Sequence, residues 1–354
     1  MRRYAPTVSA LSGDRVAPYP KIELHVHLEG TVRPETLLAI GKRNDYPLPA
    51  DTVEGIAALY DFRDFAHFIE VWVLTTNALQ TSDDFRSVVV EYAREAAAHG
   101  AVYLEGIFSP SERARRGVGW DEIFSGYCDG AQEARELHGV EVRLTPDVVR
   151  GFSLEEADET VRHSIAYRDR GVVGVGLGGH EATHPPEPYE PAFRRALSAG
   201  LASVPHAGET AGPASIRGAL DTLGAHRLRH GIRAADDDGL LAELAARGIV
   251  CDVCPISNVR TRVVRSLDEH PLPILAAAGV RCSVSTDDPA MFGTDLGRDY
   301  AAAVALGVDP RTIYEAAVAG ALCDDPTKRR LQQIGASFDW PSAGASEAVA
   351  SLLS

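Results

Sequence analysis

Short apolar segments alternate with amphipathic stretches along most of the chain. Eight segments of five to nine residues are rich in β-branched or other apolar side chains, as buried strands are. They cover residues 22–27, 102–108, 141–149, 172–178, 202–207, 227–232, 249–254 and 281–285. Strand-like and helix-like stretches thus alternate eight times, which predicts an α/β fold of the (β/α)8 TIM barrel type. A doubly wound open sheet is the alternative.

The stretches between the apolar segments have helical periodicity. Residues 84–99 and 121–137 are examples, and a capping box at Ser153 and Glu156 predicts another helix start. Several of these stretches end at a glycine, a common helix stop. The glycines are Gly100, Gly139, Gly171, Gly200, Gly248 and Gly279.

The segment from about residue 31 to residue 80 is too long for one crossover helix. It holds an aromatic cluster of Tyr60, Phe62, Phe65, Phe68 and Trp72. We expect extra helices here that cover the mouth of the barrel; the alternative is that these aromatic residues are ordinary core. We therefore divide the chain into an N-terminal arm (1–19), a barrel (20–335) with this helical lid, and a C-terminal tail (336–354).

Metal-binding and acid–base residues recur where the predicted strands end, which is where barrels of this type carry their chemistry. The first strand ends in His25-Val-His27, and side chains two residues apart on a strand point to the same side. The later signals are His206 and Glu209 after the fifth segment, His230 in the sixth, and Asp287 and Asp288 after the eighth. Each signal alone is weak, but four of them at four strand ends are hard to assign to chance.

Three imidazoles and one carboxylate make a ligand set suited to zinc. The set is His25, His27, His206 and Asp287. It leaves room for a bound water, whose pKa would fall towards about 7. A binuclear hydrolase of related architecture would need a bridging ligand, commonly a carbamylated lysine. Because no lysine occurs between Lys42 and Lys328, we expect one zinc per chain.

Three further polar residues near this set are free to act on a substrate. They are Glu209, His230 and Asp288. Two of them can carry protons and the third can accept a hydrogen bond. These are the groups needed to add water to an electron-poor carbon and to expel a nitrogen.

Composition excludes several classes of partner. The 354 residues include 35 Lys and Arg against 50 Asp and Glu, a net charge of -15, which disfavours nucleic acid and anionic membranes as partners. No apolar run approaches the roughly 20 residues that span a bilayer. Five cysteines are too few, and odd in number, for a disulfide scaffold, so we expect a cytoplasmic protein. The sequence does not indicate an oligomeric state.

Four motifs together resemble those of the adenosine deaminase family, which belongs to the amidohydrolase barrels. The motifs are PKIELHVHLEG (20–30), HAGE (206–209), RHG (229–231) and STDDP (285–289). They stand in the family's order and at its spacing, so the resemblance covers residues from about 20 to 321. It implies a zinc-dependent hydrolase that removes ammonia from a 6-aminopurine.

The resemblance also implies a role for each polar residue at the site. His25, His27, His206 and Asp287 would hold zinc. Glu209 would protonate N1 of the purine, and His230 would orient the hydroxide and receive its proton. Asp288 would contact N7, and the backbone of Gly179 would meet N3.

The chain departs from the family pattern at three places. Family members read close to DLAGDE after the fourth strand, whereas this chain has GLGGHE at residues 176–181, with His180 in place of an acid. Arg229 replaces the usual Gly or Asp, and Ser285 replaces the usual Asn. The first of these changes is similar to relatives that accept adenine or 6-amino-6-deoxyfutalosine, a menaquinone precursor.

We expect a nucleoside, adenosine or deoxyadenosine, to be the preferred substrate. Glu29 is an acceptor suited to a ribose hydroxyl, and Phe62 and Phe65 of the lid are further candidates for substrate contact. Aminodeoxyfutalosine, whose carboxylate His180 could face, and adenine are the alternatives. A purine-binding protein without turnover is an alternative of another class; loss of Glu209 or of a metal ligand would be its signature, and none is lost.

The ligand set predicts the metal content of the purified protein. We expect about one zinc per chain by elemental analysis, and we expect His27→Ala and Asp287→Ala to lower metal content and activity together. Two metals per chain would contradict a mononuclear site.

Overall fold

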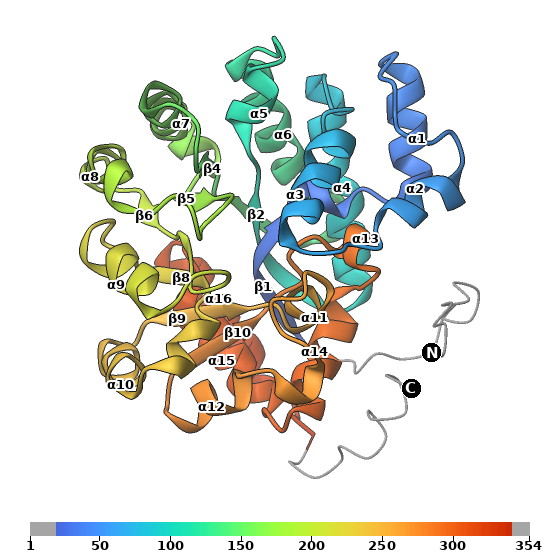
Figure 1. Cartoon of the computed structure of the whole chain (residues 1–354). Coiled ribbons are helices and arrows are strands. Elements are labelled where there is room, and N and C mark those ends of the chain that lie inside the picture. The colour runs from blue at the N-terminus through green and yellow to red at the C-terminus, as the bar shows by residue number, and fades with distance from the viewer. Residues whose placement is uncertain (1–18, 342–354) are drawn as a thin grey trace.

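A computed structural model describes residues 19–341, in which helices surround a central ring of parallel strands (Figure 1). The strands are β1 (Lys21–His27), β2 (Ala101–Ile107), β3 (Glu141–Leu144), β4 (Asp147–Val149), β5 (Gly174–Gly178), β6 (Ala202–Ser203), β7 (His206–Ala207), β8 (Arg227–His230), β9 (Val250–Val253) and β10 (Arg281–Val284). The predicted arm, except for Tyr19, and residues 342–354 of the predicted tail lie outside the described residues.

The α-helices are α1 (Pro34–Arg43), α2 (Val53–Leu59), α3 (Phe65–Thr76), α4 (Ser82–Ala98), α5 (Pro110–Ala114), α6 (Trp120–His138), α7 (Leu154–Ala166), α8 (Glu190–Ser198), α9 (Pro213–Asp221), α10 (Asp238–Arg247), α11 (Pro255–Arg260), α12 (Leu272–Ala277), α13 (Pro289–Phe292), α14 (Leu296–Ala305), α15 (Pro310–Gly320) and α16 (Asp325–Ser337). Short 3-10 helices are η1 (Leu28–Thr31), η2 (Arg168–Arg170), η3 (Glu187–Tyr189), η4 (Ile232–Asp236) and η5 (Leu267–Glu269). None of the helices in residues 19–341 is long and apolar enough to cross a membrane.

All eight predicted strand segments contain strands, but two of the segments are interrupted. The third divides into β3 and β4, with Pro146 in the gap, and the fifth divides into β6 and β7, with Pro205 in the gap. Proline has no backbone N–H and cannot donate to a ladder, so each segment breaks at its proline. The eight predicted segments therefore appear as ten short strands.

Parallel pairing runs from strand to strand around the ring. The ladders join β1-β2-β3, β4-β5-β6 and β7-β8-β9-β10, and an isolated bridge between Leu144 and Val172 links the first two. A second bridge, between Val26 and Asp287, brings the chain after β10 to the end of β1. There the N–H of His27 donates to Asp287 O at 2.7 Å, and the N–H of Asp287 donates to His25 O at 3.1 Å. The arrangement confirms the predicted barrel class.

The predicted helices form with slightly different bounds: the stretch 84–99 is α4 (Ser82–Ala98) and the stretch 121–137 is α6 (Trp120–His138). The Ser153 hydroxyl accepts from Glu156 N, and the Glu156 carboxylate accepts from Ser153 N, so the capping box of α7 is present. Helix α6 ends at Gly139 with a φ of 69°, a left-handed conformation that favours glycine. Local sequence signals of this kind act within a few residues, so they hold in the folded protein.

The segment after β1 contains the extra helices α1, α2 and α3. Of these three helices, only α3 contributes side chains to the pocket at the carboxyl ends of the strands. Phe62 is buried and packs its ring against Phe68 and Phe292, with ring centroids 5.3 and 6.0 Å away. The aromatic cluster thus belongs partly to the core and partly to the pocket wall. Phe62 lies in the core, whereas Phe65, Phe68 and Trp72 line the pocket.

Candidate active site

Four side chains predicted as metal ligands converge at the carboxyl ends of the strands. His25 and His27 lie on β1, His206 begins β7, and Asp287 follows β10. The Nε2 atom of His206 lies 3.1 Å from Nε2 of both His25 and His27. The Oδ1 atom of Asp287 lies 3.3 Å from Nε2 of each of the two β1 histidines.

These separations fit a four-coordinate metal. Tetrahedral bonds of roughly 2.0–2.1 Å place neighbouring ligand atoms about 3.3 Å apart, close to what is observed. His25, His206, His230 and Asp287 also have ligand atoms within 4.8 Å of one another, so His230 borders the same point. The group can therefore hold one divalent cation.

Hydrogen bonds on the far side of the imidazoles set their tautomers. The Nδ1 atom of His206 lies 3.1 Å from Leu177 O, and that of His25 lies 3.4 Å from Asp252 O. A carbonyl accepts only, so both Nδ1 atoms carry hydrogen and both Nε2 atoms present lone pairs. Two lone pairs 3.1 Å apart repel each other, and a cation between them would remove that repulsion.

Two of the site residues have a strained backbone. Asp287 has a φ of 67° and His230 a φ of 62°, which is uncommon outside glycine. Such conformations cost roughly 1–3 kcal/mol and cluster at functional sites. The Oδ2 atom of Asp287 accepts from the Ser257 hydroxyl at 2.6 Å, which fixes the carboxylate orientation.

Glu181 holds the loop that carries Glu209. Its carboxylate accepts from the backbone N–H of Glu209 at 3.0 Å and from the Ser215 hydroxyl at 2.6 Å. It also accepts from the N–H groups of Gly208, Thr210 and Ala211. The sequence analysis did not identify Glu181, although its place directly after His180 in the GLGGHE segment was a signal.

Glu209 and His230 face each other in a buried environment, with His230 Nε2 3.6 Å from Glu209 Oε1. Burial, followed by the negative charges of Asp287 and Glu181, raises the pKa of Glu209 well above its usual range. Burial is also the largest cause that lowers the pKa of His230 to about 3. At neutral pH these shifts favour the protonated form of Glu209 and the neutral form of His230.

Asp288 points into the same pocket and is held by the lid. The indole N–H of Trp72 donates to Asp288 Oδ1 at 2.9 Å. Burial, with the neighbouring Asp287, raises the pKa of Asp288 well above its usual range. Gly30 leaves the space that this carboxyl fills, because a Cβ at residue 30 would lie 1.8 Å from Asp288 Oδ1.

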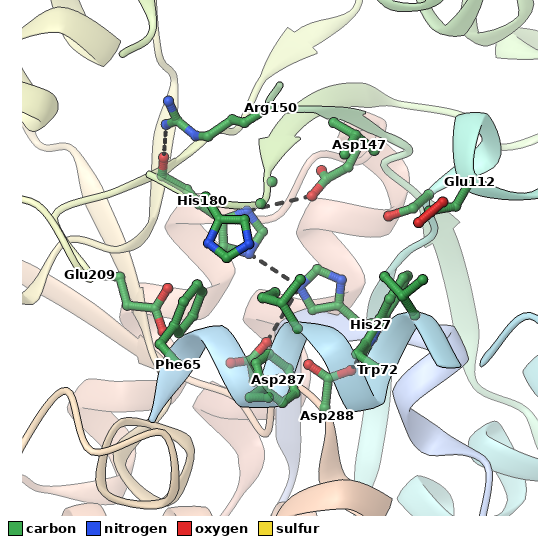
Figure 2. Close-up of a pocket in the computed structure, with 18 of the residues that line it drawn as sticks. His27, Phe65, Trp72, Glu112, Asp147, Arg150, His180, Glu209, Asp287 and Asp288 are labelled. Atoms are coloured by element: carbon green, nitrogen blue, oxygen red, sulfur yellow. Dashed lines mark hydrogen bonds and ion pairs between the residues drawn. The ribbon is translucent and has the colours of Figure 1, made fainter. Parts of the chain in front are cut away.

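The structure brings some of the predicted substrate contacts to the pocket and places others elsewhere. Phe65, Gly179 and Asp288 line it, and Figure 2 shows Phe65 and Trp72 extending from α3 toward the pocket that also holds Glu209 and Asp288. Phe62 lies behind this layer in the core and does not line the pocket. A substrate contact by Phe62 remains a prediction without direct geometric support.

Glu29 is also placed away from the pocket lining. Its buried Oε1 accepts from Ser109 N at 2.8 Å and lies 3.6 Å from the guanidinium of Arg113. Ser109 itself lines the pocket, so Glu29 fixes a wall residue. Its predicted contact with a ribose hydroxyl remains a prediction.

Two departures from the family pattern have clear structural partners. The Ser285 hydroxyl accepts from the backbone N–H of Leu24 and of His25, both at 3.1 Å, and so links β1 to the chain after β10. Arg229 is fully buried and pairs with Asp147. The third departure, His180, lines the pocket, where its ring is 6.1 Å from that of Phe65.

A barrel with three imidazoles and a carboxylate at its strand ends, beside a buried acid, defines a hydrolase of the amidohydrolase class. Comparison with known proteins narrows the class, since residues 20–334 match the family described as "Adenosine deaminase". The chain belongs to this family. It is a deaminase that acts on an aminopurine-type substrate.

Individual relatives carry more specific names. The chain is 54% identical over 337 residues to an aminodeoxyfutalosine deaminase from Acidothermus cellulolyticus, covering 93% of this chain and 95% of the relative. It is 37% identical over 274 residues to an adenine deaminase from Rhodospirillum rubrum, covering 77% and 82% of the two chains. These names do not support adenosine, which the sequence analysis ranked first.

Solved structures agree on the fold. An adenine deaminase from Arthrobacter aurescens superimposes with a TM-score of 0.86 at 32% identity, covering 90% of this chain and 98% of that one. An amidohydrolase from Burkholderia ambifaria with bound Zn gives a TM-score of 0.80 at 26% identity, covering 95% and 93%.

The buried histidines predict an unusual pH response. Burial lowers the pKa of His27 and of His230 to about 3, against 6.5 in an unfolded chain. The contribution of these neutral histidines to the free energy of unfolding is therefore complete above pH 6.5 and is lost as the pH falls towards 3. In that range the two histidines bind protons in the unfolded chain but not in the folded protein.

We expect the imidazole NMR signals of both residues to stay unchanged from pH 7.5 to pH 5 in metal-free protein. His27→Gln and His230→Gln would assign the signals. A midpoint near 6.5 for either residue would contradict the buried, neutral state.

Proposed function

We propose that this chain deaminates 6-amino-6-deoxyfutalosine, replacing the 6-amino group by oxygen and releasing ammonia. The observation that carries the proposal is the 54% identity to an aminodeoxyfutalosine deaminase over nearly the full length of both chains. Adenine is the second candidate, supported by relatives at 37% identity and by a solved structure at 32%. In both cases the reacting part of the substrate is the same aminopurine ring.

The shape of the pocket favours a substrate larger than the bare ring. The pocket continues from Glu209 and Asp288 past Gly178 and Gly179 to His180 and other residues of the same rim. The two glycines leave room beside the ring, where a substituent must pass. His180 can donate a hydrogen bond at the far end of that path.

A cation near this rim suits a substrate with a carboxylate. Arg150 lines the pocket, and its guanidinium donates to His206 O at 2.8 Å and to His184 O, two neutral acceptors. The charge of Arg150 therefore lies beside the path, within electrostatic reach of the carboxylates of Glu181 and Asp147. An anionic tail would be attracted to this side of the pocket.

We infer that the metal is zinc, held by His25, His27, His206 and Asp287. Three nitrogen ligands and one carboxylate are a donor set typical of zinc, and the Zn-bound structural relative supports this identity. When bound, zinc would supply an acidified water as the nucleophile.

The chain's own residues would then move protons and orient the purine. Protonated Glu209 donates to N1, which makes the adjacent C6 more electrophilic. Neutral His230 accepts a proton from the attacking water. The sequence analysis gave Asp288 the role of acceptor, but burial raises its pKa, so the protonated carboxyl would instead donate to N7, and the backbone at Gly179 would meet the N3 edge.

The acid–base role of Glu209 can be separated from metal binding. Glu209→Gln keeps the size of the side chain but removes its proton, so we expect turnover to fall by about 10²- to 10⁴-fold while zinc content and ligand binding persist. Glu70→Gln on the exposed side of α3 is the matched control and should leave turnover unchanged. Near-normal turnover in Glu209→Gln would refute the role.

The substrate is tested by kcat/KM over aminodeoxyfutalosine, adenosine, deoxyadenosine and adenine. We expect aminodeoxyfutalosine to exceed each of the others by at least about tenfold, roughly 1.4 kcal/mol in transition-state binding. His180→Asp should lower kcat/KM for aminodeoxyfutalosine much more than for adenine, because it places a negative charge where the carboxylate would lie.

Thr183→Asp provides the control for charge, since it adds an acid to the same loop outside the pocket lining. Thr183→Asp should leave kcat/KM for aminodeoxyfutalosine and for adenine close to the values of the parent protein. If adenine exceeds aminodeoxyfutalosine tenfold, the proposed substrate is wrong while the deaminase assignment stands.

A further inference from the structure

We propose that Asp147, held in place by Arg229, is a positioning residue for the metal ligand His206. Asp147 begins β4 and Arg229 lies on β8, and both side chains are buried. The Oδ2 atom of Asp147 lies 3.5 Å from Nδ1 of His206, the ring nitrogen opposite the Nε2 that meets His25 and His27. Asp147 also lines the pocket and has a carboxylate oxygen within 4.8 Å of a ring nitrogen of His27. The inference rests on the metal site proposed above.

Arg229 determines which way the Asp147 carboxylate turns. Its Nη1 donates to Asp147 Oδ1, while its Nη2 donates to Thr145 Oγ1 at 2.8 Å and to Thr145 O at 3.2 Å. The guanidinium is thus anchored at three acceptors. Asp147 Oδ1 is occupied by this contact, which leaves Oδ2 to face His206.

Oδ2 of Asp147 has no hydrogen-bond partner among the described residues, although it is buried. A buried carboxylate oxygen without a hydrogen bond destabilises the folded protein. We therefore infer that Oδ2 of Asp147 has an electrostatic role. Nδ1 of His206 lies 3.5 Å from this oxygen and already donates to Leu177 O. A carboxylate beside that N–H reinforces the tautomer that keeps the Nε2 lone pair toward the metal.

Two glycines on β5 leave the space for this pair. A Cβ at residue 176 would lie 2.0 Å from Asp147 Oδ1 and 2.1 Å from Arg229 Nη1. A Cβ at residue 178 would lie 2.4 Å from Asp147 Oδ2 and 3.7 Å from His206 Nδ1. Arg229, Gly176 and Gly178 therefore form one arrangement, since any side chain at the glycines would displace the carboxylate.

The barrel contains a second buried pair that serves as a control. Arg227 on β8 donates to the carboxylate of Asp252, whose other oxygen accepts from the Ser283 hydroxyl at 2.6 Å. Asp252 reaches His25 only through its backbone carbonyl. Asp252→Asn thus removes an equally buried, arginine-paired carboxylate without removing one that faces an imidazole.

The test measures zinc affinity by competition with a chelator, using the full chain. In Asp147→Asn the amide oxygen must face Arg229, so the amide N–H₂ turns toward the Nδ1–H of His206 and opposes it. We expect zinc binding to weaken by about 10- to 100-fold, the usual effect of losing such a partner. Asp252→Asn should stay within about threefold of the parent protein.

Two further variants keep the test decisive if Asp147→Asn folds poorly. Asp147→Asn combined with Arg229→Met removes both charges, and Gly178→Ala displaces the carboxylate while keeping its charge. Both should show the same weakened zinc affinity. If the double variant regains the parent affinity, the loss came from an unpaired arginine and the inference is wrong.

Two other results would also overturn it. If Asp147→Asn has unchanged zinc affinity and a raised KM, Asp147 contacts the substrate. If the parent protein binds two zinc ions per chain and Asp147→Asn binds one, Asp147 is itself a metal ligand. A parent protein that binds no zinc would instead refute the proposed function. Failure of the inference and failure of the proposed function are therefore distinguishable.

Discussion

The two backbone hydrogen bonds between the end of β1 and Asp287 are the contact on which the site depends. They join the first strand of the barrel to the chain that follows the last one, so residues more than 250 positions apart face the same point. Without this pairing, His25 and His27 would have no carboxylate beside them. Ser285, which accepts from two N–H groups of β1, extends the same contact by side chain.

Burial at that point gives the ionisable side chains their chemical states. Burial lowers the pKa of His27 and of His230 to about 3, and burial, followed by the nearby charge of Asp287, raises the pKa of Glu209 and of Asp288 well above the usual range. One environment thus favours protonated carboxyl groups and neutral imidazoles at the same pH. The protonation states of these side chains therefore depend on their burial in the site as well as on their residue types.

In the proposed function, the purine ring and the rest of the substrate would contact different structural elements. The residues that would contact the purine lie at or just after the ends of strands. The residues that would meet a substituent, Phe65 and His180, come from α3 and from the loop after β5. Relatives with a common core can therefore differ in substrate through changes in these two segments.

The sequence by itself determined what depends on local geometry. Alternation along β1 places His25 and His27 on one side, and the capping box at Ser153 forms as predicted, because both depend on chain geometry within a few residues. The motifs likewise identified the family and the four side chains that converge at the strand ends. The repeated strand and helix pattern predicted the barrel but left a doubly wound sheet as the alternative.

Only the tertiary structure decided which distant groups meet. Glu29 and Phe62 carry suitable chemistry, but packing turns them to Ser109 and to the aromatic core. Glu181 supports the Glu209 loop, and Arg229 finds Asp147 82 residues away, through space that two glycines leave. Such contacts join residues that are far apart in the sequence, so helix and strand periodicity cannot predict them. They form only when the barrel folds and the side chains pack in its interior.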